Sequence, residues 1–249
     1  MHDLVIRGGT IVDGSGAEKY SGDIAIDDGK LSQVGGTVGP AREELDADGA
    51  IVAPGWVDIH THYDGQVTWD PHLTPSGWHG VTSTVMGNCG VGFAPAAPDK
   101  HDWLISLMEG VEDIPGSALA EGIEWTWESF PEYLDALDAM PRSIDVGTQV
   151  PHGAIRAYVM GERGATNQPA EADDMKGMAD IVEQGLRAGG LGFSTSRTML
   201  HRSVDGVPVP GTFAGADELL AIGQGMKRAG HGVFELATDF GLGGMDGKF

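Results

Sequence analysis

Short apolar runs separated by turn signals dominate roughly the first fifty residues of the chain. Two of the separators are Asp27-Asp28-Gly29 and Asp48-Gly49, and an Asp-Gly pair between apolar runs is a strong signal for a tight hairpin turn. The pattern predicts a small all-β module over residues 1–53, with almost no candidate catalytic side chains beyond scattered acids. Its predicted strands are residues 4–12, 23–26, 30–34, 44–47 and 50–52.

From Pro54 onward the periodicity changes, and apolar strands alternate with amphipathic helices. The predicted strands are residues 56–60, 81–86, 144–150, 191–194 and 233–237, and the predicted helices are residues 102–110, 130–140, 173–188 and 217–229. Ser129 is suited to cap the second helix, with Pro131 early in its first turn. Repeated strand–helix units favour a parallel sheet, open or closed as a barrel, so we predict an α/β domain over residues 54–249.

A pair of histidines, His60 and His62, stands at the end of the first strand of this region. Alternate residues of a strand point to the same side, so the two imidazoles leave the strand end in parallel, as a metal site requires. Asp58 lies on the same side and could fix one ring through its second nitrogen. Two surface histidines in a loop are the alternative. The apolar strand that delivers the pair favours the metal site, because barrel enzymes place their catalytic groups at the carboxyl ends of strands.

The second strand of the region ends at Met86-Gly87-Asn88-Cys89-Gly90, which brings Cys89 to the same rim. Two histidines and one cysteine with an open position form a catalytic type of zinc site, so we predict His60, His62 and Cys89 as metal ligands. The alternative for Cys89 is a small buried apolar residue. It is the only cysteine of the chain, which excludes an internal disulfide and favours a reducing compartment, the cytoplasm.

Two later strand ends carry candidate substrate contacts. His152 and Arg156 follow the third strand; His152 could contact substrate and Arg156 could pair with a carboxylate, or the segment could simply start a helix with a surface arginine. Ser196 and Arg197 end the fourth strand and are suited to an anionic group, or their hydroxyl could cap a turn. Nucleotide-binding loops and a nucleophile elbow have no matching pattern in the sequence.

The composition of the chain excludes some classes of binding partner. Its 249 residues carry a formal net charge of -22, so nucleic acid and anionic membrane surfaces are unlikely partners by charge repulsion. No apolar run is long enough to span a bilayer, and the first residues lack the basic region of a secretory signal. We therefore predict a cytoplasmic protein that binds neither nucleic acid nor membranes.

These motifs together resemble the amidohydrolase superfamily, and within it the D-aminoacylase (N-acyl-D-amino-acid deacylase) family. The strand that carries His60 and His62 is shared by many amidohydrolases, whereas the segment around Cys89 is the narrower marker. The segments that carry the resemblance are residues 53–64, 87–95, 127–134, 152–156 and 192–196.

The resemblance implies a TIM-type (β/α) barrel beside a small β-sandwich built from both chain ends, with residues 1–53 as the N-terminal share of the sandwich. It also implies one or two zinc ions, with His60 and His62 as the first-strand metal pair and Cys89 in the place where relatives use a carboxylated lysine. The implied reaction is hydrolysis of the amide bond of an N-acyl-D-amino acid by a metal-activated water.

The sequence departs from the family pattern after the fifth predicted strand. The family needs histidine ligands from later strands and a late aspartate as general acid/base, which we expect beyond Phe249. The fifth strand carries no histidine, and only Glu235 or Asp239 could substitute. We therefore expect the N-terminal part of a longer enzyme. The alternatives are a dihydropyrimidinase-like cyclic-amide hydrolase, which Cys89 in place of a lysine disfavours, and an incomplete, non-catalytic barrel that needs a homo-oligomer or a complementing C-terminal part.

Overall fold

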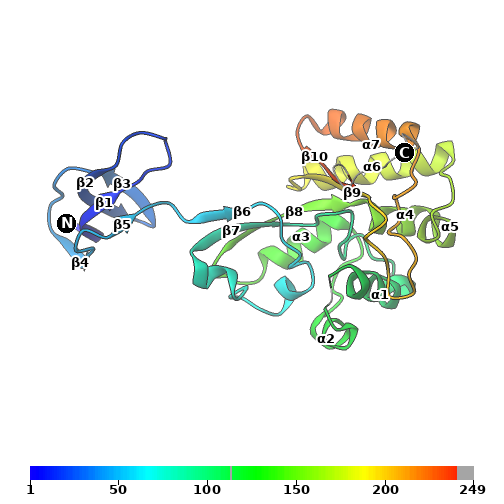
Figure 1. Ribbon diagram of the computed structural model, residues 1–249, viewed down its shortest axis with the longest axis horizontal. Coiled ribbons are helices and arrows are strands. Elements are labelled where there is room, and N and C mark those ends of the chain that lie inside the picture. Colours follow the sequence, from blue (N-terminus) through cyan, green and yellow to red (C-terminus); the bar gives the residue numbers. More distant parts are fainter. Residues whose placement is uncertain (113, 240–249) are drawn as a thin grey trace. The chain divides into compact units, whose positions relative to one another are not determined.

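The computed structural model describes residues 1–112 and 114–239 (Figure 1). The chain divides into two compact units, one from Met1 to Trp56 and the other from Val57 onward. Each unit has a hydrophobic core of its own. Within the described residues, no helix is long and apolar enough to cross a membrane.

The first unit is one mixed sheet with strand order β3-β2-β1-β4, and β5 pairs with β1. Its strands are β1 (His2–Ile11), β2 (Tyr20–Asp27), β3 (Lys30–Val34), β4 (Ala41–Asp46) and β5 (Ile51–Val52). Asp28 and Gly29 join β2 to β3 with positive φ angles of 51° and 71°, as the predicted hairpin turn requires. The described part of this unit is a single sheet, so the sandwich implied by the family resemblance is not confirmed, because a sandwich needs a second layer.

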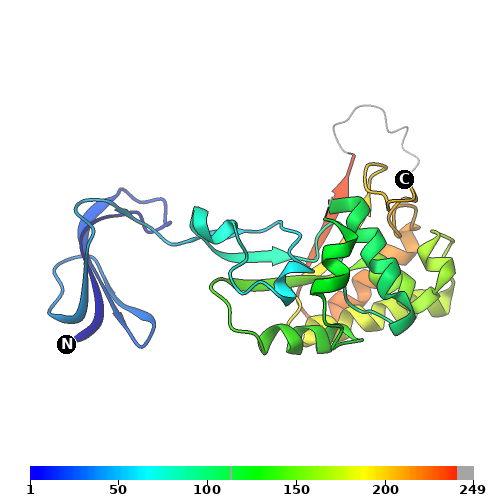
Figure 2. The same ribbon diagram turned by 90° about the horizontal axis from the view of Figure 1, so that it is seen from below.

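The second unit is built on a parallel sheet in which strand order follows chain order, from β6 to β10 (Figures 1 and 2). Its strands are β6 (Trp56–Asp58), β7 (Val81–Met86), β8 (Asp145–Pro151), β9 (Gly192–Arg197) and β10 (Val233–Thr238). Every strand predicted in this region is present, with shifts at the ends. The α/β fold with an incomplete barrel-like parallel sheet is therefore confirmed, and it gathers the carboxyl ends of the strands at one rim.

Helices connect the strands. They are α1 (His101–Glu112), α2 (Gly116–Gly122), α3 (Phe130–Asp138), α4 (His152–Met160), α5 (Glu162–Ala165), α6 (Ala172–Arg187) and α7 (Ala216–Ala229), with short 3₁₀ turns at Gln66–Thr68, Ser76–His79 and Pro98–Lys100. Ser129 caps α3 in a reciprocal capping box with Glu132, as predicted. The sequence predicted α4 only as the alternative of a helix that starts near His152, because most of its residues are buried and it shows no polar stripe.

The core of the second unit lies between the sheet and its helices. The central strands are the buried ones: Val150 of β8 and Phe193 of β9 are fully enclosed. Helices α6 and α7 lie side by side, and α6 also packs against β8 (Figures 1 and 2). The edge strand β10 leaves Val233 and Leu236 exposed. Parallel sheets are usually covered on both faces, so apolar side chains of this edge strand are left unprotected.

Candidate metal centre

The three predicted metal ligands meet at the rim of the sheet. His60 and His62 follow β6, and Cys89 follows β7. One ligand atom from each of the three residues lies within 4.8 Å of the other two. The His60 Nε2 and Cys89 Sγ atoms are 3.2 Å apart, and the centroids of the two imidazole rings are 5.4 Å apart. Two imidazole nitrogens and a thiol gathered this closely are the donor types of a tetrahedral zinc site. Their role as ligands is a prediction that this geometry supports.

The turn that carries Cys89 has an unusual backbone. Gly87, Cys89 and Gly90 have positive φ angles of 72°, 56° and 73°. A left-handed conformation is unfavourable for a residue with a Cβ, so Cys89 holds it only because neighbouring groups fix the turn. Glycine is required at position 87 for a second reason: a Cβ there would overlap the main chain of Gln149 on β8. The turn therefore lies directly against the next strand.

Side chains from several strands fix this turn. The amide of Asn88 donates to the carbonyl oxygens of Thr61 (2.9 Å) and Val85 (3.0 Å), and its own oxygen accepts from Gln149 Nε2 at 2.7 Å. Ser194 of β9 donates from its hydroxyl to the Gly87 carbonyl, and the same hydroxyl oxygen accepts from the Gly90 N–H at 3.0 Å. The position of the Cys89 thiol is therefore set by the sheet as a whole.

We expect Gly87→Ala to damage this turn. The variant carries two penalties. A residue with a Cβ in the left-handed conformation costs roughly 1–2 kcal/mol, and the added Cβ also overlaps the main chain of Gln149. The matched control is Gly230→Ala, because Gly230 also has a positive φ (88°) but open space where the Cβ would lie. In urea unfolding, Gly87→Ala should lose clearly more free energy of unfolding than Gly230→Ala. Equal losses would show that the turn does not press against β8.

The carboxylate beside the histidine pair is Glu112, not Asp58. Asp58 was predicted to fix an imidazole ring, but its side chain accepts from the backbone N–H of His60 at 3.2 Å. The Glu112 Oε1 atom, from the end of α1, lies 3.2 Å from Nδ1 of His62. A carboxylate at this nitrogen orients a histidine whose other nitrogen binds a metal. No local sequence pattern predicts this contact, because Glu112 and His62 are far apart along the chain.

Of the three candidate ligands, His62 is partly buried and Cys89 is buried, and several carboxylates lie near them. Burial, and to a smaller extent the charges of Glu235, Glu112 and Asp64, raise the pKa of the Cys89 thiol to about 12. Burial also raises the pKa of Asp64 to about 8, and lowers that of His62 to about 4. His62 is thus neutral at physiological pH, the form that binds metal. A thiol among carboxylates becomes a thiolate only beside a positive charge, so this donor set fits a divalent cation.

His152 and Arg156 lie elsewhere in the unit. Both are buried in α4. The imidazole of His152 lies between Thr195 Oγ1 (2.8 Å) and Glu218 Oε1 (2.9 Å), and Arg156 donates to the same Glu218 oxygen. The structure places these two side chains at Glu218 and not among the metal-ligand candidates. The alternative of a surface arginine is wrong for Arg156, and the predicted substrate contacts of both residues remain predictions.

Ser196 and Arg197 end β9 close to the loop that follows it. The buried Ser196 hydroxyl lies 3.0 Å from His201 Nδ1. Burial lowers the pKa of His201, the charge of Asp239 partly offsets this, and the charge of His60 adds to the lowering. Arg197 donates to the Ala214 carbonyl. No pattern in the sequence predicts the position of His201, because loop conformation has no periodic signal.

Glu235 and Asp239, the two acids that could replace a histidine ligand on the fifth strand, have different partners in the structure. Glu235 Oε2 accepts from the N–H of Cys89 at 2.9 Å and so lies at the candidate metal centre. Asp239 accepts instead from the Thr198 hydroxyl and from the Met199 N–H. Only Glu235 touches one of the predicted ligands.

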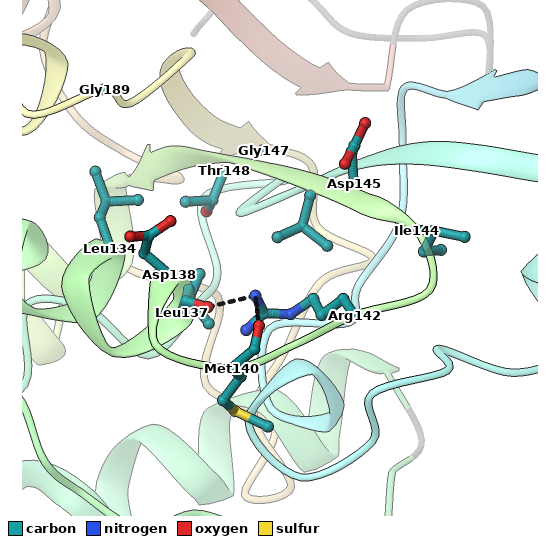
Figure 3. Close-up of a pocket in the computed structure, with 11 residues that line it drawn as sticks. Leu134, Leu137, Asp138, Met140, Arg142, Ile144, Asp145, Gly147, Thr148 and Gly189 are labelled. Carbon is teal, nitrogen blue, oxygen red and sulfur yellow. Dashed lines mark hydrogen bonds between the residues drawn. The ribbon is translucent and has the colours of Figure 1, made fainter. Parts of the chain in front are cut away.

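A pocket of about 460 Å³ opens at the other end of β8, between that strand and the end of α3 (Figure 3). Arg142 lies in its middle and donates to the carbonyl oxygen of Leu137, in the last turn of α3, and to that of Met140, just after the helix (Figure 3). This contact caps the helix, and Asp138 and Asp145 also line the pocket. None of the predicted site residues line it, so the candidate chemistry lies at the opposite rim.

Comparison with known proteins agrees with this geometry. Residues 43–247 match the profile of the amidohydrolase family. The chain belongs to the amidohydrolase family. A curated relative is the D-aminoacylase of Alcaligenes xylosoxydans xylosoxydans, which is 33% identical over 78% of this chain. The N-acyl-D-aspartate deacylase of the same organism is 30% identical over 92% of this chain.

Solved structures of D-aminoacylase and of a related deacylase resemble this amidohydrolase chain. A crystal structure of D-aminoacylase superposes with a TM-score of 0.74 and 28% identity over 94% of this chain. The N-acyl-D-glutamate deacylase of Bordetella bronchiseptica, solved with zinc and a phosphonate mimic of the tetrahedral intermediate, superposes with a TM-score of 0.71, also at 28% identity. The match covers 37% of the curated D-aminoacylase and 44% of each of these two solved chains. The chain thus spans less than half the length of these relatives.

Proposed function

We propose that this chain carries the zinc-binding part of an enzyme that hydrolyses the amide bond of N-acyl-D-amino acids. The observation that carries the proposal is the convergence of His60, His62 and Cys89 at the carboxyl ends of two adjacent strands. The resemblance to D-aminoacylase and to two N-acyl-D-amino-acid deacylases supports the substrate class.

Zinc fits the residues of this site. His60, His62 and Cys89 would hold it, and a bound zinc ion would activate water and polarise the amide carbonyl. The residues of the chain have supporting tasks: Glu112 orients His62, and the Asn88 and Ser194 contacts keep the thiol at the rim. One related structure is described with zinc and another with a binuclear metal centre, which supports one or two zinc ions here.

Residues at the ends of β8 and β9 are the candidates for substrate binding. We propose that Ser196 and Arg197, at the end of β9, contact the carboxylate of the amino-acid part, since a guanidinium and a hydroxyl suit an anion. His152 and Arg156 are retained as weaker candidates, because Glu218 already binds both. The general acid/base is proposed to be an aspartate beyond Phe249, as the family pattern implies.

The whole enzyme is proposed to need more than the described residues. We propose a small β module over residues 1–53 and a catalytic region over 54–249, which the division into two compact units near Trp56 supports. The exposed apolar side chains of β10 support a further contact, either with a second copy of the chain or with a complementing C-terminal part. The net charge of -22 continues to argue against nucleic acid and membrane partners, and a cytoplasmic location is part of the proposal.

A cyclic-amide hydrolase is the second candidate function. A D-hydantoinase of Rhizobium radiobacter is 42% identical to this chain, but over only 88 residues, or 35% of the chain. The deacylases match more than twice that length, and for this reason they carry the proposal.

The two functions are separated by a substrate assay. Zinc-loaded protein is incubated with N-acetyl-D-amino acids, with their L enantiomers and with a hydantoin, and the release of free amine or ring-opened product is measured. We expect hydrolysis of the D-acyl substrates above the L and the hydantoin, with loss on adding a chelator. Preferential opening of the hydantoin would favour the second candidate. If zinc-loaded protein hydrolyses none of them, this chain alone is not a deacylase.

A further inference from the structure

Glu235 occupies a defined position beside the candidate metal centre. It lies on β10 and pairs in register with Ser194 of β9, the residue that fixes the Cys89 turn from the neighbouring strand. From there its Oε2 atom accepts the N–H of Cys89 at 2.9 Å. The hydrogen bond joins residues 146 positions apart in the chain. The turn is therefore held by β10 as well as by β8 and β9.

Glu235 differs from the other groups that hold the turn, because it is charged. Asn88, Gln149 and Ser194 fix the same turn with neutral side chains. A neutral amide oxygen can also accept the Cys89 N–H, so the hydrogen bond alone does not require a carboxylate. The Glu235 side chain is partly buried on β10, where an ionised carboxylate is unfavourable without a positive charge nearby. The hydrogen bond to the Cys89 N–H places this carboxylate beside the ligand cluster.

We propose that Glu235 is a positioning residue of the metal centre: it holds the Cys89 turn and adds the negative charge that attracts a divalent cation to this rim. The proposal rests on the metal site under the proposed function. A carboxylate one hydrogen bond away from a ligand residue lies close to the cation. Because little water separates the two charges, their Coulomb attraction is strong. Groups in this position typically change metal affinity by roughly 10- to 100-fold.

The test measures the affinity for zinc alone, by competition with a chromophoric chelator, in the full chain. The variants are Glu235→Gln, which keeps the hydrogen-bond acceptor without the charge, and Glu235→Ala, which removes both. Glu121→Gln is the matched control, since Glu121 is an exposed carboxylate of α2. Cobalt(II) is added to each protein in parallel, because its thiolate charge-transfer absorption reports whether Cys89 is still a ligand.

We expect a roughly 10-fold or greater loss of zinc affinity in Glu235→Gln and at least as large a loss in Glu235→Ala, with the control unchanged. In Glu235→Gln at saturating cobalt the thiolate absorption should persist, because the turn is still held. Unchanged affinity in Glu235→Gln would overturn the proposal, whatever Glu235→Ala does, since the charge would then be irrelevant. Absence of zinc binding by the unaltered protein would instead contradict the metal site itself, so the two failures are distinguishable.

Discussion

Replacing Cys89 with alanine is expected to reduce the zinc content of the purified protein from near-stoichiometric to near zero. The thiolate is the only anionic ligand among the three candidates, and the two histidines alone form a weak site. The loss should exceed the roughly 10- to 100-fold that groups around a metal ligand contribute. Metal analysis by mass spectrometry after gel filtration measures it directly.

Two further variants make the Cys89 result specific. Cys89→Ser keeps the size of the side chain but offers a poor zinc ligand, so it should lose zinc almost as completely as Cys89→Ala. His79→Ala removes an exposed histidine outside the cluster and should keep the metal. Circular dichroism verifies that each variant is folded. Full retention of zinc in folded Cys89→Ala would remove Cys89 from the site and with it the main support for the proposed function.

The ligand cluster could be predicted from sequence because each of its parts is a local signal. The alternation of a strand places His60 and His62 on one side, and the end of the next strand delivers Cys89. Parallel strands joined in chain order then bring both ends to one rim. No contact between distant segments had to be guessed. The same logic placed the strands of the second unit almost where the structure has them.

The surroundings of that cluster could not be predicted in the same way. Glu112, Asp64 and Glu235 act on the ligands through side-chain direction and burial, neither of which has a periodic signature. Only Glu235 was considered beforehand, and its position remained open because the sequence does not determine the register of β10 against β9. Asp58 shows the opposite error: its position was predicted correctly, but its side chain turns back to the backbone.

His152 and Arg156 were placed at the right strand end, but their partner could not be foreseen. Glu218 comes from the first turn of α7, more than sixty positions later, and it is 2% exposed. A buried carboxylate that accepts from an imidazole and a guanidinium determines where both point. Sequence shows three polar residues here, whereas the structure shows one charged network that joins α4, α7 and, through Thr195, β9.

This network leads to the second large expected effect, on stability. Removing one partner of a buried ion pair typically costs about 3–5 kcal/mol, because the remaining charge stays buried without compensation. We therefore expect Glu218→Ala to lower the free energy of unfolding of the second unit by about that amount, since it leaves Arg156 unpaired and His152 without one of its two partners. Glu218→Gln should cost less, as it retains one acceptor. Urea unfolding followed by tryptophan fluorescence measures both.

The effect should depend on pH in a definite direction. Burial alone would raise the pKa of Glu218, but the hydrogen bonds and charges of His152 and Arg156 outweigh it, so the pKa lies below its ordinary value of 4.5. A carboxyl whose pKa is lowered by folding stabilises the fold above its unfolded pKa and loses that contribution as the pH falls through the folded one. Burial lowers the pKa of His152 as well, which also disfavours the folded state in acid.

The stability gap between the unaltered protein and Glu218→Gln should therefore be widest near neutral pH and shrink below about pH 4. Glu121→Gln, an exposed control, should show no such gap at any pH. A gap that stays constant down to strongly acidic pH would mean that Glu218 stabilises the fold by its shape and not by its charge. In that case His152 and Arg156 would not depend on Glu218 for their position, and their assignment to substrate would regain strength.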